Sequence, residues 1–170
     1  MTIETQTVGI VGAGLIGRSW AHVFARAGWQ VKVWDPSGAQ REAAHAQIAQ
    51  SLHDLQVHGL VQDAAGAATR VQIVASLEQA VDTAAYVQES GPETLDAKRA
   101  TFAALDAAAP AHCVLASSTS AIVARNSRSR WPGARAASSR IRSTRRIWCR
   151  WSSCAARRGP ASRPRPGRAT

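Results

Sequence analysis

The stretch Val8-Gly-Ile-Val-Gly-Ala-Gly-Leu-Ile-Gly17 decides the fold of this 170-residue chain. Its first part is a short apolar run that predicts a buried strand over residues 8–11. Three glycines in the spacing Gly-x-Gly-x-x-Gly follow at once, and residues 15–27 then carry apolar side chains at helical spacing. A strand, a glycine turn and a helix in this order are typical of the start of a parallel α/β sheet.

The three glycines of this turn have separate physical roles. Gly12 allows the tight turn from strand to helix, Gly14 lets the backbone approach a pyrophosphate, and Gly17 lets the helix pack closely on the strand. The first helical residues, Leu15 and Ile16, would present free N–H groups and the positive end of the helix dipole to the phosphates. The loop therefore predicts a dinucleotide site, with a glycine-rich turn that binds nothing as the alternative.

An acidic residue, Asp35, follows the second predicted strand over residues 31–34 and lies 21 residues after Gly14. A carboxylate at this position accepts hydrogen bonds from the adenosine ribose hydroxyls and repels a 2′-phosphate. Neither Pro36 nor Ser37 is an arginine that would counter that repulsion, and the nearest arginine that follows is Arg41. Asp35 therefore predicts NAD rather than NADP as the cofactor, although an aspartate before a proline is also an ordinary turn residue.

The remainder of residues 1–124 alternates between strand and helix patterns. Further strands are predicted over 71–74, 85–88 and 114–117, and helices over 38–61, 77–81 and 95–108. Gly59 and Gly66 are expected to break the long helical stretch. The predicted fold class is α/β: a Rossmann-type, doubly wound, mostly parallel sheet with a helical insertion, followed by a disordered Arg-rich tail.

The charge balance changes abruptly after residue 124. Residues 1–124 hold seven basic and eleven acidic residues, whereas residues 125–170 hold fourteen arginines and no acid, which accounts for the net charge of +10. We therefore predict two parts, a dinucleotide-binding domain over 1–124 and an Arg-rich tail over 125–170. Arginines interleaved with tryptophans suit an Arg-rich nucleic-acid-binding protein, which is the alternative function. A tail with so few aliphatic residues is also expected to be disordered and without a role, so a nucleic-acid partner is not favoured.

Other classes of protein are disfavoured by the same sequence. No apolar run approaches the roughly 18 residues of a membrane-spanning helix, and the N-terminus lacks the pattern of a secretory signal. The three cysteines, Cys113, Cys149 and Cys154, show neither a disulfide framework nor zinc-ligand spacing, so no metal site is predicted. We expect a soluble cytoplasmic protein with no membrane partner.

Three ordered stretches resemble the NAD-binding domain of the L-3-hydroxyacyl-CoA dehydrogenase family: Val8–Asp35, Tyr86–Asp106 and Val114–Ile122. Residues 14–21 (Gly-Leu-Ile-Gly-Arg-Ser-Trp-Ala) and the Ser-Ser-Thr-Ser turn over 117–120 are most similar to the branch of lambda-crystallin and L-gulonate 3-dehydrogenase. The resemblance implies NAD-dependent oxidation of a 3-hydroxy group to a ketone, with a hydroxy acid or a hydroxyacyl-CoA as the substrate. It also implies that members of the family homodimerise through a helical C-terminal domain, which we expect this chain to lack.

The resemblance assigns roles to three further residues. Glu93 would lie beside the cofactor, Lys98 near the nicotinamide and the CoA portion of a substrate, and Ser120 would hydrogen-bond the substrate oxygen. Ser118 stands where many relatives have asparagine, a departure that fits the lambda-crystallin branch. Without the resemblance, Glu93 and Lys98 suit a solvated helix start, and the serines suit a polar turn or a helix N-cap.

The sequence lacks a residue that would act as the base for the proton of the substrate hydroxyl group. Histidine is the usual base at neutral pH, and the resemblance implies one soon after the serine turn, in a His-Pro-Val-Asn-Pro-Pro motif. No histidine follows His112, and the four earlier ones lie on predicted helices, so the catalytic histidine is absent. Codons exist for residues 140–160 that encode this motif when they are read one base out of frame. We therefore expect residues 125–170 to be frameshifted, and the chain to bind NAD weakly without turnover.

Overall fold

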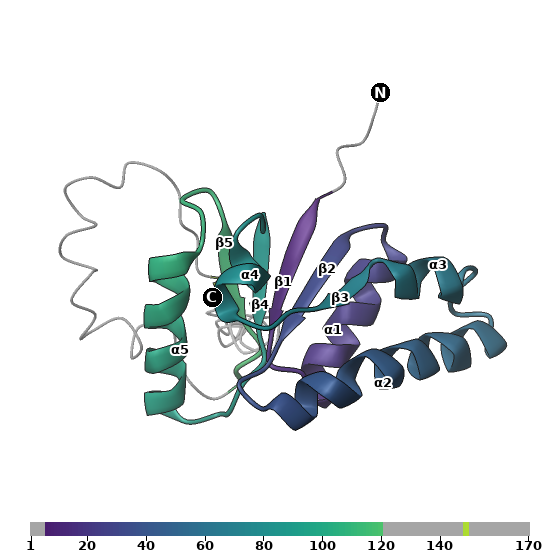
Figure 1. Ribbon diagram of the computed structural model, residues 1–170, viewed down its shortest axis with the longest axis horizontal. Helices are drawn as coiled ribbons and strands as arrows, with labels where there is room; N and C mark the ends of the chain where they lie inside the picture. The colour runs from purple at the N-terminus through teal and green to yellow at the C-terminus, as the bar shows by residue number, and fades with distance from the viewer. Residues whose placement is uncertain (1–5, 121–147, 150–170) are drawn as a thin grey trace, which may run out of the picture.

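The computed structural model describes residues 6–120 and the backbone of residues 148–149. Within these residues, six parallel strands form one sheet in the order β3-β2-β1-β4-β5-β6 (Figure 1). The strands are β1 (Thr7–Val11), β2 (Gln30–Trp34), β3 (Val71–Ile73), β4 (Tyr86–Glu89), β5 (Val114–Ser117) and β6 (Trp148–Cys149). This order is that of a doubly wound dinucleotide-binding sheet, so the predicted α/β class is confirmed. Apart from the backbone of β6, the tail that is predicted to be disordered lies outside the described residues.

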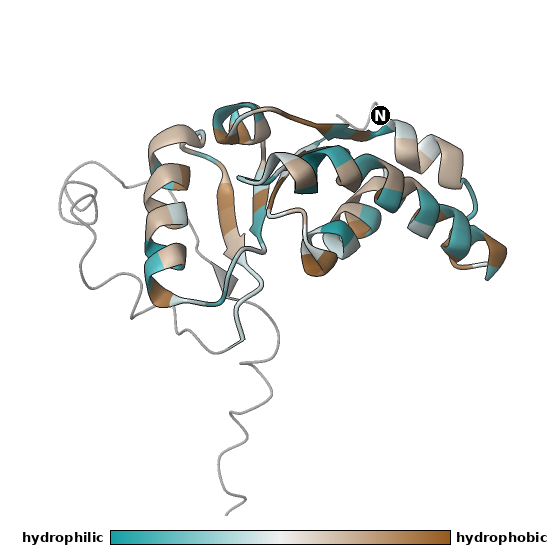
Figure 2. Ribbon diagram, turned by 60° about the horizontal axis from the view of Figure 1, so that its bottom comes forward, coloured by the Kyte–Doolittle hydropathy of each residue, from teal (hydrophilic) through white to brown (hydrophobic). Residues whose placement is uncertain are grey.

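Helices cover both faces of the sheet (Figure 1). They are α1 (Leu15–Arg26), α2 (Gly38–Val57), α3 (Ala64–Thr69), α4 (Leu77–Val81) and α5 (Leu95–Ala108). Two separate apolar cores result: α1, α2 and α3 enclose one, and α4 and α5 enclose the other. Strand β1 contributes to both, because Val8 and Ile10 face the first core and Val11 faces the second. Figure 2 shows apolar segments in the central strands, whereas much of α2 is hydrophilic.

Four of the helices begin with a side-chain cap. Ser37, Asp63, Ser76 and Thr94 each accept a hydrogen bond from the backbone N–H three residues later. A cap of this kind contributes about 1 kcal/mol, because it satisfies a backbone donor that the helix itself leaves unpaired. Helix α1 differs, since Gly14 stands at its N-cap position and offers no side chain. Among the described helices, α1 alone starts without a side-chain cap.

The prediction that Gly66 breaks a helix is wrong. Helix α2 ends at Val57, and Gly59 follows it with a φ of 70°, as expected of a glycine that terminates a helix. Gly66 instead lies inside α3, where its N–H donates to the Asp63 carboxylate at 2.8 Å. A Cβ at Gly66 would lie 2.0 Å from that carboxylate, so the missing side chain is what allows Asp63 to cap α3. Within the described residues, no helix is long and apolar enough to cross a membrane.

Candidate functional site

The strand order reverses between β1 and β4, and the glycine loop leaves β1 at this switch point. Gly12 has a φ of 104°, and its N–H donates to the Trp34 carbonyl oxygen at 2.8 Å. A Cβ at Gly12 would lie 2.8 Å from the carbonyl group of Ser90, the residue that follows β4. A larger residue would therefore be strained in itself and would push the ends of β1 and β4 apart.

The other two glycines of the loop differ in what surrounds them. A Cβ at Gly17 would lie 1.8 Å from the Gly12 carbonyl oxygen, so the close approach of α1 to the loop requires glycine. A Cβ at Gly14 would meet nothing within 4 Å, so the space in front of the uncapped end of α1 is open. Leu15 and Ile16 are 72% and 53% exposed there. Open space at a helix start without a capping side chain fits a pyrophosphate.

Asp35 lies against the same loop. One carboxylate oxygen accepts a hydrogen bond from the Ala13 N–H at 2.8 Å, and the other accepts one from the Ser37 N–H at 2.8 Å. The Arg41 guanidinium donates to the Asp35 backbone carbonyl oxygen at 2.6 Å, so it is held by the backbone. The carboxylate is thus fixed beside the loop, on the β2 side, where an adenosine ribose would lie.

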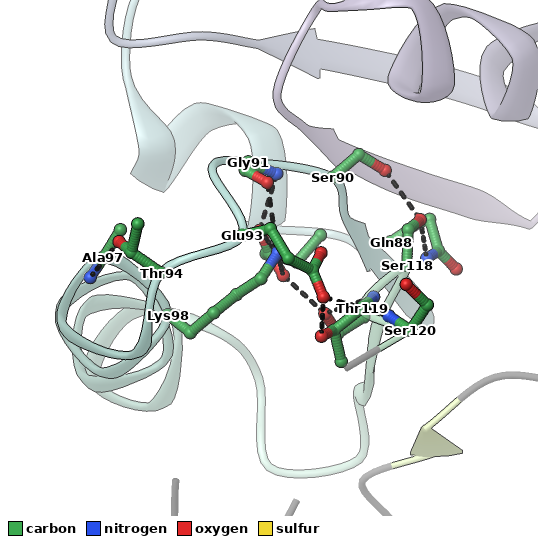
Figure 3. Close-up of polar contacts among 12 residues, drawn as sticks. Gln88, Ser90, Gly91, Glu93, Thr94, Ala97, Lys98, Ser118, Thr119 and Ser120 are labelled. Atoms are coloured by element: carbon green, nitrogen blue, oxygen red, sulfur yellow. Dashed lines mark hydrogen bonds and ion pairs between the residues drawn. The ribbon is translucent and has the colours of Figure 1, made fainter. Parts of the chain in front are cut away.

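A buried charged cluster lies at the carboxyl ends of β4 and β5 (Figure 3). The Lys98 ammonium lies 2.9 and 2.8 Å from the two carboxylate oxygens of Glu89, and these residues are 3% and 1% exposed. The Glu89 carboxylate also accepts from the Ser117 hydroxyl at 2.6 Å and from the Gly91 N–H at 2.6 Å. Lys98 also donates to the Gly91 carbonyl oxygen at 3.1 Å. The cluster therefore ties helix α5 to both strand ends.

Glu93 and Ser120, which the resemblance assigned to one site, do lie together. Glu93 accepts hydrogen bonds from the Thr119 hydroxyl and, at 3.0 Å, from the Ser120 N–H. Lys98 is not part of this contact, because its ammonium is directed at Glu89. Sequence reasoning missed Glu89 in this region, and it singled out Ser117 only as the first residue of the Ser-Ser-Thr-Ser turn. Glu89 and Ser117 are the polar last residues of their strands, Tyr-Val-Gln-Glu and Val-Leu-Ala-Ser, and this signal is present in the sequence.

In the described part of the chain, no three His, Cys, Asp or Glu side chains are grouped so that they could hold a metal ion. The polar groups at the strand ends are instead hydroxyls, carboxylates and one ammonium, which suit hydrogen bonding to an organic ligand. The glycine loop, Asp35, the Glu89–Lys98 cluster and the Glu93–Ser120 contact occupy the same edge of the sheet.

Two curated proteins are similar in sequence to this chain over the part that holds the candidate site. The chain is 39% identical to a lambda-crystallin homolog from Bos taurus over 119 residues, which is 68% of this chain and 37% of that protein. It is 42% identical to an L-carnitine dehydrogenase from Streptomyces griseus over 117 residues, which is 69% of this chain and 34% of that protein. The chain thus spans about a third of the length of these relatives.

Solved structures give the same result. A 3-hydroxybutyryl-CoA dehydrogenase from Escherichia coli K12 superposes with a TM-score of 0.67 at 28% identity, over 74% of this chain and 27% of that one. FadB2 from M. tuberculosis superposes with a TM-score of 0.67 at 33% identity, over 72% of this chain and 44% of that one.

The family model described as "3-hydroxyacyl-CoA dehydrogenase, NAD binding domain" matches residues 7–130. The resemblance seen in the sequence is confirmed: this chain belongs to the 3-hydroxyacyl-CoA dehydrogenase family and carries its NAD-binding domain.

Proposed function

We propose that this chain is the cofactor-binding part of an NAD-dependent enzyme that oxidises a 3-hydroxy group to a ketone. One observation carries the proposal. The open, uncapped start of α1 at Gly14 and the carboxylate of Asp35 lie on the same sheet edge as the Glu93–Ser120 contact. A cofactor held at the first two groups would extend toward the third.

The residues of the loop and of β2 would hold the cofactor. The N–H groups at Leu15 and Ile16 would bind the pyrophosphate, and Gly12, Gly14 and Gly17 give it room. Asp35 would accept hydrogen bonds from the adenosine ribose hydroxyls. When bound, NAD supplies the acceptor for the hydride that leaves the substrate carbon. Asp35 supports NAD over NADP, because a carboxylate repels a 2′-phosphate.

The substrate end of the site would use the turn that follows β5. Ser120 is exposed, and its hydroxyl would hydrogen-bond the substrate oxygen. Glu93 holds this turn through the Thr119 hydroxyl and the Ser120 N–H. Lys98, expected beside the nicotinamide, has its ammonium on Glu89 and the Gly91 carbonyl, so we propose that it acts by holding the loop after β4.

The substrate class we propose is a hydroxy acid or a hydroxyacyl-CoA. The names of the relatives support both, because they include L-carnitine dehydrogenases and 3-hydroxybutyryl-CoA dehydrogenases. The family resemblance implies that its members homodimerise through a C-terminal domain, and we propose the cytoplasm as the compartment because the cysteines show no disulfide framework. Size-exclusion chromatography with light scattering, and fractionation of cells that express the chain, test these two points.

We propose that the chain alone does not turn over, because no histidine follows the serine turn. The proposed cause is a frameshift over residues 125–170, and the nucleotide sequence around codons 120–130 tests it. The frameshift proposal fails if the shifted frame does not encode the His-Pro-Val-Asn-Pro-Pro motif. The comparisons give no support to a nucleic-acid-binding function for residues 125–170, whose side chains lie outside the described residues.

Calorimetry with the purified chain tests the proposed function. NAD and ADP-ribose are expected to bind, and NADP is expected to bind more weakly than NAD. With NAD present, L-gulonate, L-carnitine and 3-hydroxybutyryl-CoA are each expected to give no NADH. Failure of both NAD and ADP-ribose to bind would overturn the cofactor proposal, and NADH formation would overturn the proposal that the chain alone is inactive.

A further inference from the structure

Ser90 occupies a special place in the fold, because it is the first residue after β4 and adjoins the glycine loop. Its N–H donates to the Val11 carbonyl oxygen at 2.8 Å, which continues the pairing of β1 with β4. A Cβ on Gly12 would lie 2.8 Å from the Ser90 carbonyl atoms, so the two backbones are in direct contact. The backbone of Ser90 is therefore fixed at the switch point of the sheet.

The hydroxyl of Ser90 contacts Ser118, to which the Gln88 amide also donates (Figure 3), and Ser118 has three hydrogen-bond partners in all. The Ser118 oxygen lies 3.1 Å from the Trp20 indole nitrogen, 2.8 Å from the Gln88 amide nitrogen and 2.9 Å from the Ser90 oxygen. Both nitrogens carry hydrogen and donate. They occupy the two lone pairs of the Ser118 oxygen, so the Ser118 hydrogen has to be donated to Ser90.

The orientation of Gln88 is itself fixed by Tyr86. The Tyr86 hydroxyl lies 3.0 Å from the Gln88 amide oxygen, which only accepts. Burial raises the pKa of Tyr86, so the phenol keeps its hydrogen and donates it. Gln88 is 1% exposed and therefore presents its NH2 group to Ser118. The hydrogen bonds run in one direction, from Tyr86 through Gln88 and Ser118 to Ser90.

This direction leaves Ser90 with a hydrogen of its own to donate. The Ser90 oxygen accepts from Ser118, and among the described residues its hydroxyl has no other partner. Ser90 is only partly buried, in contrast to Glu89 before it. A half-buried hydroxyl whose donor hydrogen has no protein acceptor is suited to an acceptor atom of a ligand.

The fold indicates which ligand atom lies near Ser90. Asp35 assigns the adenosine half of a dinucleotide to the β2 side, and the uncapped start of α1 holds the pyrophosphate. The other half of the dinucleotide therefore crosses to the β4 side, where Ser90 lies. The group that distinguishes this half is a nicotinamide, and its carboxamide oxygen is a hydrogen-bond acceptor.

We propose that the Ser90 hydroxyl donates a hydrogen bond to the nicotinamide carboxamide oxygen, and that Ser118, Gln88 and Trp20 set its direction. The proposal rests on the proposed NAD site. It makes Ser118 a positioning residue, and it gives a physical role to the departure from asparagine at this position.

Calorimetric titration of the full chain with NAD and with ADP-ribose, which lacks the nicotinamide, tests the proposal. Ser90→Ala is expected to weaken NAD binding about threefold to tenfold, the net effect of one hydrogen bond, and to leave ADP-ribose binding unchanged. Ser90→Thr keeps the hydroxyl and is expected to retain most of the NAD affinity. Thermal denaturation of each variant shows whether the fold is intact.

Trp20→Phe tests the direction of the network, because it removes the indole donor and keeps an aromatic ring. With a lone pair of Ser118 released, Ser90 is able to donate back to Ser118. NAD affinity is expected to fall about twofold to threefold, and the double variant Trp20→Phe/Ser90→Ala is expected to bind NAD no more weakly than Ser90→Ala alone.

The outcomes separate this inference from the proposed function. Wild-type chain that binds neither NAD nor ADP-ribose overturns both. NAD binding that Ser90→Ala leaves unchanged overturns only the inference. An equal loss of NAD and ADP-ribose binding by Ser90→Ala also overturns it, because the effect would then come from the glycine loop. Additive losses in the double variant would overturn the positioning role of the network.

Discussion

The ammonium of Lys98 and the carboxylate of Glu89 form a bidentate ion pair, at 2.9 and 2.8 Å, that is almost wholly buried. Two opposite charges in such a place are tolerated only when each has further hydrogen-bond partners. Glu89 has the Ser117 hydroxyl and the Gly91 N–H, and Lys98 has the Gly91 carbonyl oxygen. The pair therefore couples α5 to the strand ends that carry the candidate site.

Lys98→Met is expected to lower the free energy of unfolding by about 3 kcal/mol, because it leaves the Glu89 carboxylate buried without its counter-charge. Glu89→Gln/Lys98→Met, which removes both charges, is expected to recover a large part of that loss. Urea denaturation measures both. Asp96→Asn serves as the control, since Asp96 is 98% exposed and 3.8 Å from Arg99, and should change stability by less than about 1 kcal/mol. Equal losses of stability in the single and double variants would show that the unpaired Glu89 carboxylate is not the cause of the loss.

The glycine loop allows stability and cofactor binding to be separated. Gly17→Ala places a methyl group 1.8 Å from the Gly12 carbonyl oxygen and is expected to cost about 1–3 kcal/mol of stability. Gly14→Ala meets no protein atom within 4 Å, so stability is expected to stay within about 1 kcal/mol of wild type. Because its methyl group enters the space assigned to the pyrophosphate, NAD binding is expected to fall at least tenfold. A Gly14→Ala chain that binds NAD normally would show that the pyrophosphate lies elsewhere.

Local patterns in the sequence were sufficient for the loop and for most of the elements. The strand over 114–117 and the helices over 77–81 and 95–108 have the predicted bounds, because each is defined by its own run of apolar or helix-forming residues. The prediction that Gly66 breaks a helix is wrong because glycine is a poor helix former by propensity alone, whereas Gly66 lies in α3 as the residue whose N–H binds the Asp63 cap.

The buried cluster shows where sequence patterns stop being informative. Glu89 and Lys98 are nine residues apart, and Glu89 and Ser117 are 28 apart. Nothing in the local sequence indicates that these groups meet, since the meeting depends on the parallel pairing of β4 with β5. The same pairing brings Glu93 to Ser120, two residues that the family resemblance assigned to the cofactor and to the substrate without predicting a contact between them.

Asp35 is expected to control the choice between NAD and NADP. Asp35→Ser removes the carboxylate that repels a 2′-phosphate, while a serine hydroxyl still suits the hydrogen bond from the Ala13 N–H. The affinity ratio of NAD to NADP is expected to fall at least tenfold, because NAD loses an acceptor for its ribose hydroxyls and NADP is no longer repelled. Calorimetry with both dinucleotides measures the ratio, and Asp54→Asn, an exposed change on α2, is the matched control. An unchanged ratio would place the adenosine ribose away from Asp35.

His22 is expected to make the stability of the fold depend on pH. It lies in a groove between α1 and α2 that Arg18, Asp54 and His58 also line, and its Nε2 atom is buried without a hydrogen-bond partner in the described part of the chain. Burial, and then the nearby Arg18 charge, lower the pKa of His22, although a hydrogen bond with the Ile48 backbone acts in the opposite direction.

Because the pKa of His22 is lower in the folded chain than in the unfolded chain, protonation favours unfolding. The stabilising contribution of neutral His22 is present above the unfolded pKa of about 6.5 and is lost as the pH falls through the lower, folded pKa. As the pH is lowered from about 7.5 to 5.5, the urea concentration at the unfolding midpoint of the wild-type chain is therefore expected to decrease. The midpoint of His22→Gln is expected to decrease less. His53→Gln changes an exposed histidine of α2 and is expected to keep the wild-type pH dependence. A His22→Gln chain with the full wild-type decrease would show that other groups cause it.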